Sequence, residues 1–207
     1  MIRHRWAALA VLATMTLAAC SGGGNGSADG RVDDPNATAS SVAENMKDLE
    51  EALDLAVPDG FVRQPDAVGD TGPSDLEKAI RDDGGDDARD ILTKSRFVQG
   101  YQRMWTRSGD EIVSYVYQFA DTAGAVEYTN RLNSDSLAPT EGVSISPFDV
   151  PDITGAVGVN TSEPTLASSS VTFVKGPYSV EIVVSGPTPT GLEALVTALA
   201  EEQYSRL

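Results

Sequence analysis

The chain has 207 residues, and its 15 lysines and arginines stand against 31 aspartates and glutamates, giving a formal charge of −16. The only cysteine, Cys20, and the only histidine, His4, both fall in the first twenty residues. The rest of the chain therefore excludes disulfides, cysteine or histidine catalysis, and the zinc and haem sites that need these side chains. Nucleic acid is also excluded as an expected partner, because so acidic a surface repels phosphates.

The N-terminus has the parts of a secretory signal peptide. Residues 1–5 are basic, and residues 6–19 are apolar or small apart from two threonines. This stretch is too short to cross a hydrocarbon core of ~30 Å at ~1.5 Å per residue. It ends in Leu17-Ala18-Ala19-Cys20, which resembles the lipobox of bacterial lipoproteins. The sequence is therefore identified as that of an exported protein with a lipoprotein signal.

The lipobox resemblance implies a specific processing route. Residues 1–19 would be removed, and Cys20 would be lipidated on its sulfur and then acylated, palmitate being a typical chain. Two or more acyl chains give stable anchoring, so we expect a cell-membrane protein on the extracytoplasmic face. The excess of arginine over lysine and the many alanines, glycines and valines suggest a high-GC genome. Together with the lipobox, this composition suggests an actinobacterium.

Residues 20–40 predict the lipidated cysteine and a flexible tether. Ser21 to Gly30 is rich in glycine and serine, and such a segment cannot bury a core. Roughly 20 flexible residues have a root-mean-square reach of about 25 Å, enough to hold a domain away from the lipid headgroups. We expect a single domain over residues 41–207.

Three helical segments are expected in the first part of that domain. Apolar residues at helical spacing predict a helix from about Ser41 to Leu55 that stops before Pro58. Ser74 and Glu77 have the spacing of a capping box for a second helix. A third short helix is expected after the glycines at 84–85, so the last two helices would form a hairpin.

From Phe97 the apolar period changes to two. Two strands that meet at the turn Arg107–Asp110 predict a β-hairpin. Asp121 is placed to cap the helix that follows, which continues to Leu132, and residues 133–140 are expected to form a loop.

The C-terminal part of the sequence predicts a similar order of elements. A weak strand is expected over Gly155–Thr161, followed by a hairpin with strands over 169–174 and 178–184. Thr190 and Glu193 form a second capping box, and the apolar residues after it recur at helical spacing.

Two β-hairpins are expected, each followed by a helix, and an N-terminal helical segment precedes them. This order predicts an α+β fold with an antiparallel sheet. The order of elements over residues 100–132 and 169–207 also suggests a ββα duplication. The strings Pro58-Asp59-Gly60-Phe61 and Phe97-Val98-Gln99-Gly100-Tyr101, with the closing helix, resemble secreted α+β lipoproteins of the Mog1/PsbP-like type. This resemblance implies a curved sheet and a non-catalytic binding or accessory module.

The first hairpin holds the candidate ligand-binding residues, which are Tyr101, Arg103, Trp105, Tyr115 and Tyr117. If the first three share a face and the last two share one on the neighbouring strand, cross-strand pairing would bring both sets into contact. Aromatic rings beside a guanidinium suit a sugar, a peptide or a carboxylate ligand. Core packing is the competing and commoner role, and Arg103 would then need an acidic partner or access to solvent.

Other chemistry has weaker support in the sequence. The acidic run from Asp82 to Asp90 offers oxygen ligands for calcium, but its spacing does not fit an EF-hand, and a solvated turn between helices explains it equally well. A glycosidase needs two carboxylates about 5 to 9.5 Å apart, and no motif selects such a pair. The nucleophile and phosphate-binding motifs are missing too. We therefore expect no enzyme, no catalytic residues, no metal and no cofactor.

These observations favour a membrane-anchored, extracytoplasmic binding or accessory module of the cell envelope. Its partners would be the membrane, through the lipid on Cys20, and an envelope ligand or protein. The alternative is a hydrolase of envelope glycans or peptides that uses only carboxylates.

Overall fold

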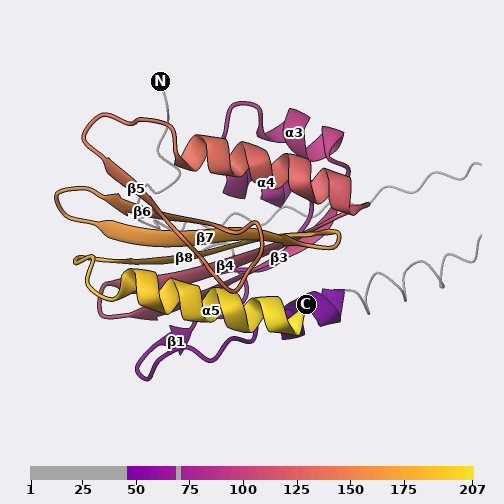
Figure 1. Cartoon of the computed structure of the whole chain (residues 1–207). Helices are drawn as coiled ribbons and strands as arrows, with labels where there is room; N and C mark the ends of the chain where they lie inside the picture. Colours follow the sequence, from indigo (N-terminus) through magenta and orange to yellow (C-terminus); the bar gives the residue numbers. More distant parts are fainter. Residues whose placement is uncertain (1–45, 69–70) are drawn as a thin grey trace, which may run out of the picture.

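An antiparallel sheet of eight strands forms the centre of the computed structural model, which describes residues 46–68 and 71–207 (Figure 1). Cys20, the segments predicted to be a signal peptide and a tether, and the first residues of the predicted domain lie outside the described part. The strands are β1 (Val62–Arg63), β2 (Gly72–Ser74), β3 (Phe97–Arg107), β4 (Asp110–Phe119), β5 (Ser144–Phe148), β6 (Val157–Ser162), β7 (Ala167–Lys175) and β8 (Tyr178–Gly186).

The strand order is β1-β3-β4-β8-β7-β6-β5, and β2 also pairs with β3. The two predicted hairpins, β3–β4 and β7–β8, are confirmed, and they lie side by side because β4 pairs with β8. The short strands β1, β2 and β5 were not predicted. Strand β5 contains Pro147, which suits its position at the sheet edge because proline has no backbone N–H to donate to a neighbouring strand.

Helices cover both faces of the sheet, and the predicted α+β class is confirmed (Figure 1). Residues 46–52 are helical, which matches part of the helix expected over 41–55. The other helices are α2 (Leu76–Asp83), α3 (Ala88–Lys94), α4 (Thr122–Ser136) and α5 (Leu192–Arg206). None of the helices in the described part of the chain is long and apolar enough to cross a membrane.

The helix ends correct several expectations. Asp121 caps α4 as predicted, since its carboxylate accepts a hydrogen bond from the Gly124 amide at 2.9 Å. Helix α2 is capped by Asp75 rather than Ser74, and α5 begins after Gly191, without a side-chain cap. Helix α4 continues to Ser136, into the segment expected to be a loop.

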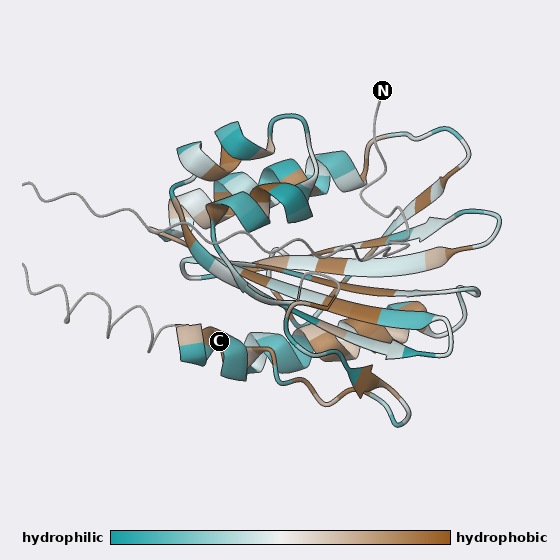
Figure 2. Cartoon of the chain, turned by 180° about the vertical axis from the view of Figure 1, so that it is seen from behind, coloured by the Kyte–Doolittle hydropathy of each residue, from teal (hydrophilic) through white to brown (hydrophobic). Residues whose placement is uncertain are grey.

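The two sheet faces carry separate cores. On one, which we call the α5 face, α5 and the 46–52 helix pack on Tyr101, Trp105 and Val116. On the other, the α4 face, α2, α3 and α4 pack on Tyr117 and Phe119. Figure 2 shows hydrophobic residues along the central strands and mostly hydrophilic ones on the helices above the α4 face.

This arrangement bears on the suggested duplication. The units β3–β4–α4 and β7–β8–α5 do share an order of elements. Because β4 and β8 are antiparallel neighbours, a duplicated unit would repeat by a two-fold axis perpendicular to the sheet, which keeps both helices on one face. Helices α4 and α5 lie on opposite faces (Figure 1). The similarity is therefore one of element order and not of packed units.

Candidate functional site

The register of the β3–β4 hairpin divides the five predicted site residues between the two faces. Tyr101 is opposite Val116, and Arg103 is opposite Ser114. Tyr101, Arg103 and Trp105 thus share the α5 face, while Tyr115 and Tyr117 share the α4 face. Each set is together as predicted, but the expected contact between the sets is wrong.

The sequence did contain the signal that decides this point. The turn places Arg107 opposite Asp110. From Arg107 back to Tyr101, each odd-numbered residue of β3 therefore lies opposite an even-numbered residue of β4. Since side chains alternate between faces with a period of two, Tyr115 and Tyr117 cannot share a face with Tyr101 and Trp105. Counting the pairs outward from the predicted turn would have separated the two sets.

The set on the α5 face is packed as core. Tyr101 and Trp105 are buried, and the Tyr101 hydroxyl donates to Asp66 Oδ2 at 2.9 Å. Burial, reinforced by that hydrogen bond, raises the pKa of Tyr101 well above its ordinary value. Arg103 is only 2% exposed, and its Nη2 donates to Glu50 Oε1 at 2.9 Å. The acidic partner expected for a buried Arg103 is therefore present.

The α4 face holds a hollow where the sheet meets two helices, and we call it the tyrosine pocket. The space that the centre of a water-sized molecule can occupy in it is about 20 Å³, and the hollow is partly open to solvent. Strands β4 and β8 supply its floor, and α2 and α4 supply its walls. Its lining residues are Asp82, Tyr115, Tyr117, Tyr128, Leu132, Ser179 and Glu181.

Sheet pairing places the floor of the tyrosine pocket. Tyr115 lies directly opposite Glu181, and Tyr117 lies directly opposite Ser179. On its other side Tyr117 is opposite Gly100, where an added Cβ would come within 2.4 Å of the tyrosine ring. Glycine at position 100 therefore gives the Tyr117 ring the space it occupies beside the pocket.

The aromatic rings of the pocket pack mainly against each other. The Tyr115 and Tyr117 rings meet edge to face with centroids 6.3 Å apart, and the Tyr117 and Tyr128 rings lie 5.8 Å apart. Tyr117 and Tyr128 are only 3% and 2% exposed, whereas Tyr115 is partly exposed. The pocket thus presents ring edges and small areas of ring surface rather than a broad stacking platform.

A buried ion pair forms one wall of the pocket. Lys78 donates from Nζ to Asp82 Oδ2 at 2.7 Å, and the same nitrogen donates to Gln102 at 2.8 Å and Ser74 at 3.0 Å. The Tyr117 hydroxyl also donates to Asp82 Oδ2, at 3.3 Å. Three hydrogen bonds satisfy the buried ammonium, and together they fix the Asp82 carboxylate at the pocket.

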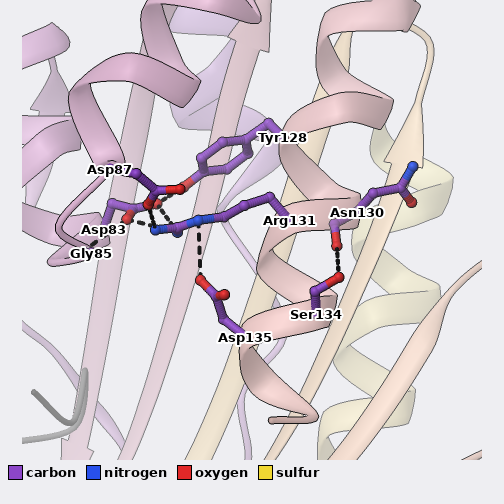
Figure 3. Close-up of polar contacts among 8 residues, drawn as sticks. All are labelled: Asp83, Gly85, Asp87, Tyr128, Asn130, Arg131, Ser134 and Asp135. Carbon is purple, nitrogen blue, oxygen red and sulfur yellow. Dashed lines mark hydrogen bonds and ion pairs between the residues drawn. The ribbon is translucent and has the colours of Figure 1, made fainter. Parts of the chain in front are cut away.

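A second network holds α4 against α2 beside the pocket (Figure 3). The fully buried Asp83 accepts from Arg131 Nη1 at 2.8 and 3.0 Å and from the Tyr128 hydroxyl at 2.9 Å. Arg131 also pairs with Asp87 and with Asp135. This network positions the Tyr128 ring, because its hydroxyl is held at a buried carboxylate.

The same contacts explain the acidic run that suggested calcium. Asp82 pairs with Lys78, and Asp83 and Asp87 pair with Arg131. Their carboxylates therefore point toward cations of this chain. Among residues 46–68 and 71–207, no group of three or more acidic, cysteine or histidine side chains is arranged to hold a metal ion.

Of the seven lining residues, the sequence analysis chose only Tyr115 and Tyr117 as ligand-binding candidates, and Asp82 entered it only as part of the acidic run. Glu181 carried a signal that was missed, because it interrupts the apolar strand β8 and points away from the face of Val180 and Ile182. Asp82 and Tyr128 come from helices whose position depends on the strand order. Sequence spacing alone does not contain that information.

No protein-family model matches the chain, and no curated protein matches its sequence. Among solved structures, the extracellular domain of PknH from Mycobacterium tuberculosis aligns with a TM-score of 0.45 and 8% sequence identity. The alignment covers 78% of this chain and 91% of that domain. A similarity at this level carries no inference about family or activity.

Proposed function

We propose that the protein is a membrane-anchored extracytoplasmic lipoprotein that acts as a non-catalytic binding or accessory module of the cell envelope. The observation that carries the location is Leu17-Ala18-Ala19-Cys20 at the end of a short apolar stretch, followed by a glycine-rich tether. The observation that supports binding is the tyrosine pocket, where a sheet face and two helices form a hollow lined by aromatic and polar side chains. Concave sites of this mixed character are where proteins bind small ligands.

The anchor is tested by changing its cysteine. The wild-type chain and Cys20→Ser should be expressed in the native host and fractionated, with labelled palmitate in the medium. We expect the wild type in the membrane fraction with incorporated label, and the variant without label and outside that fraction. A Cys20→Ser chain that stays in the membrane and carries the same label would refute lipid anchoring.

The binding role is tested at the pocket. Envelope glycans and peptides should be screened against the wild type, against Tyr115→Leu in the pocket, and against Tyr178→Leu outside it. We expect a ligand whose binding is weakened by Tyr115→Leu and not by Tyr178→Leu. A ligand that both variants bind like the wild type would place its site elsewhere, and a screen without any ligand would argue for an accessory role through protein contacts.

The alternative, a carboxylate-dependent hydrolase, has one observation in its favour, which is that Asp82 and Glu181 line the same pocket. Against it, Asp82 is held in a buried ion pair with Lys78, so this carboxylate is already engaged with a cation. The same screen should monitor turnover. Product that forms with the wild type and disappears with Glu181→Gln or Asp82→Asn would establish the hydrolase instead.

A further inference from the structure

Three loops at one end of the sheet repeat a proline followed by a threonine. Ala167 at the start of β7 pairs with Ser162 and with Gly186, so the turn before β7 and the loop after β8 lie side by side. The loop before β5 adjoins that turn, because Ser144 pairs with Ser162. Figure 1 shows these loops at the end of the molecule away from the C-terminus. The four pairs are Pro139-Thr140, Pro164-Thr165, Pro187-Thr188 and Pro189-Thr190.

Three of these four threonines present free hydroxyls to solvent. Thr165, Thr188 and Thr190 are exposed, and within the part of the chain that the structure describes their hydroxyls make no hydrogen bond. The sequence predicts that Thr190 caps α5, but that helix begins without a side-chain cap. Thr140 differs, because it is half-buried and its hydroxyl donates to a backbone carbonyl at 3.2 Å. The three exposed hydroxyls therefore remain available as nucleophiles.

The prolines give these hydroxyls a particular backbone setting. Proline fixes its own φ and favours an extended backbone, which an enzyme can bind without first unfolding a helix or strand. Segments that combine threonine or serine with proline are typical acceptors of O-linked sugars. Pro187, Pro189 and Pro164 are themselves exposed, so the whole acceptor segment is accessible.

We propose that Thr165, Thr188 and Thr190 are acceptor sites for O-linked hexoses. The proposal rests on the export stated under the proposed function, because it needs a glycosyltransferase that reaches the folded or folding domain outside the cytoplasm. Sugars at these positions cover exposed loop tips, which are preferred sites of proteolytic cleavage. A hexose is neutral, whereas a phosphate on the same hydroxyls adds negative charge to a chain that already carries −16.

Each modification is a substitution without oxidation or reduction. The threonine Oγ1 forms a bond to the anomeric carbon of a hexose that is activated as a phosphate ester. The bond between that carbon and the phosphate oxygen breaks, and the phosphate ester leaves as an anion. The hydroxyl proton passes to a base of the glycosyltransferase, so the domain itself supplies only the acceptor oxygen.

The test is a mass measurement on the full-length chain from its native host. The chain should be purified from whole cells in detergent and digested with trypsin, which gives the peptides 132–175 and 176–206. We expect one or two hexoses on peptide 176–206, at Thr188 and Thr190, and one on peptide 132–175, at Thr165. Electron-transfer fragmentation, which keeps the sugar on the side chain, locates them. Thr154 is exposed but follows isoleucine, so it is the internal control and should be unmodified.

Two variants examine the role of the prolines and of the hydroxyls. Replacing Pro187 and Pro189 by alanine should lower the occupancy of Thr188 and Thr190 at least fivefold and leave that of Thr165 within twofold. Thr165→Ala combined with Thr188→Ala and Thr190→Ala should remove the sugars altogether, whereas Thr154→Ala should change nothing. All these positions are exposed, and circular dichroism checks that the variants fold.

Three results would count against the proposal, and they are distinguishable. A chain that begins at a lipidated Cys20 and carries all three threonines unmodified would refute the glycosylation and leave the proposed location standing. Hexose on Thr154 as often as on Thr165 would refute recognition of the Pro-Thr pairs. A chain that keeps residues 1–19 and carries no sugar would refute the export itself, and this inference with it.

Discussion

The two faces of the sheet use the same strand for different purposes. Strand β4 contributes Ile112 and Val116 to the α5 face and Tyr115 and Tyr117 to the α4 face. On the α5 face the apolar side chains form a continuous core with α5. On the α4 face, polar groups of α2, β8 and α4 approach the rings and leave the tyrosine pocket. Aromatic composition alone therefore does not distinguish core from site, and the partners on the facing helix decide.

Both faces also bury charged side chains, but these side chains form more of their possible hydrogen bonds on the α4 face than on the α5 face. On the α4 face, Lys78 and Asp83 are bonded to several groups each. On the α5 face, Arg103 bonds to Glu50 through Nη2, while its Nε and Nη1 have no partner among the described residues. The charge networks of the α4 face thus hold the helices of the pocket, whereas Arg103 is a polar group inside a core.

The largest expected effect is on the α5 face. Trp105→Ala removes a side chain that is 3% exposed and packed among core residues, so it should lower the free energy of unfolding by ~3–5 kcal/mol. Chemical denaturation monitored by far-ultraviolet circular dichroism measures this loss. Val98→Ala, at a position that is 52% exposed in the neighbouring part of β3, is the control and should cost little. A loss below about 1 kcal/mol for Trp105→Ala would contradict the assignment of this face as core.

The hairpins and the two long helices were predictable because local patterns specify them. Strands β3, β4, β7 and β8 alternate with a period of two, and Asp121 marks the start of α4. Strand β5 was missed because the segment from Ser144 to Phe148 has only five residues, two of which are serines, and contains a proline. The pocket required the strand order β4–β8, which brings Glu181 beside Tyr115 across 66 positions of sequence.

The second effect concerns the network that holds α4 on the α4 face. Asp83→Asn keeps the shape of the side chain but removes its negative charge. That charge strengthens the two hydrogen bonds from Arg131 and the one from the Tyr128 hydroxyl. Arg131 retains Asp87 and Asp135, so we expect a loss of about 2–3 kcal/mol rather than the full cost of an orphaned buried charge. Thermal and chemical unfolding measure it. Asp86→Asn, on the exposed turn, is the control, and equal losses for both would show that Asp83 holds nothing in place.

A smaller effect is expected at the single ion pair of Arg103. Glu50→Ala removes its carboxylate partner, and because Glu50 is itself partly exposed, we expect a loss of about 1–2 kcal/mol. Adding Arg103→Met should restore most of that stability, since a buried cation is then replaced by an apolar chain of similar length. The next residue supplies the control: Glu51→Ala breaks only an exposed pair with Lys47 and should change stability by less than about 0.5 kcal/mol. A double variant less stable than Glu50→Ala alone would show that Arg103 stabilises the core through contacts other than its charge.

The smallest expected change in stability is near the start of β4, on the α4 face. Glu111 shares the face of Tyr115 and Tyr117, and burial raises its pKa above the ordinary value of 4.5. A carboxyl group whose pKa is higher in the folded than in the unfolded state favours folding when protonated, and that contribution is lost as the pH rises through the folded pKa. Glu111→Gln removes the titration, so at pH 7 the variant should be more stable than the wild type. The gain should be a few tenths of a kcal/mol, because Glu111 is partly exposed and its charge is screened by solvent.

Below the ordinary pKa of Glu111 the stabilities of the two proteins should become equal, and denaturation curves measured from pH 4 to pH 7 follow this difference. A variant that is less stable than the wild type at pH 7 would mean that the Glu111 carboxylate has a favourable partner. The charged groups of the α4 face would then be paired as far as Glu111.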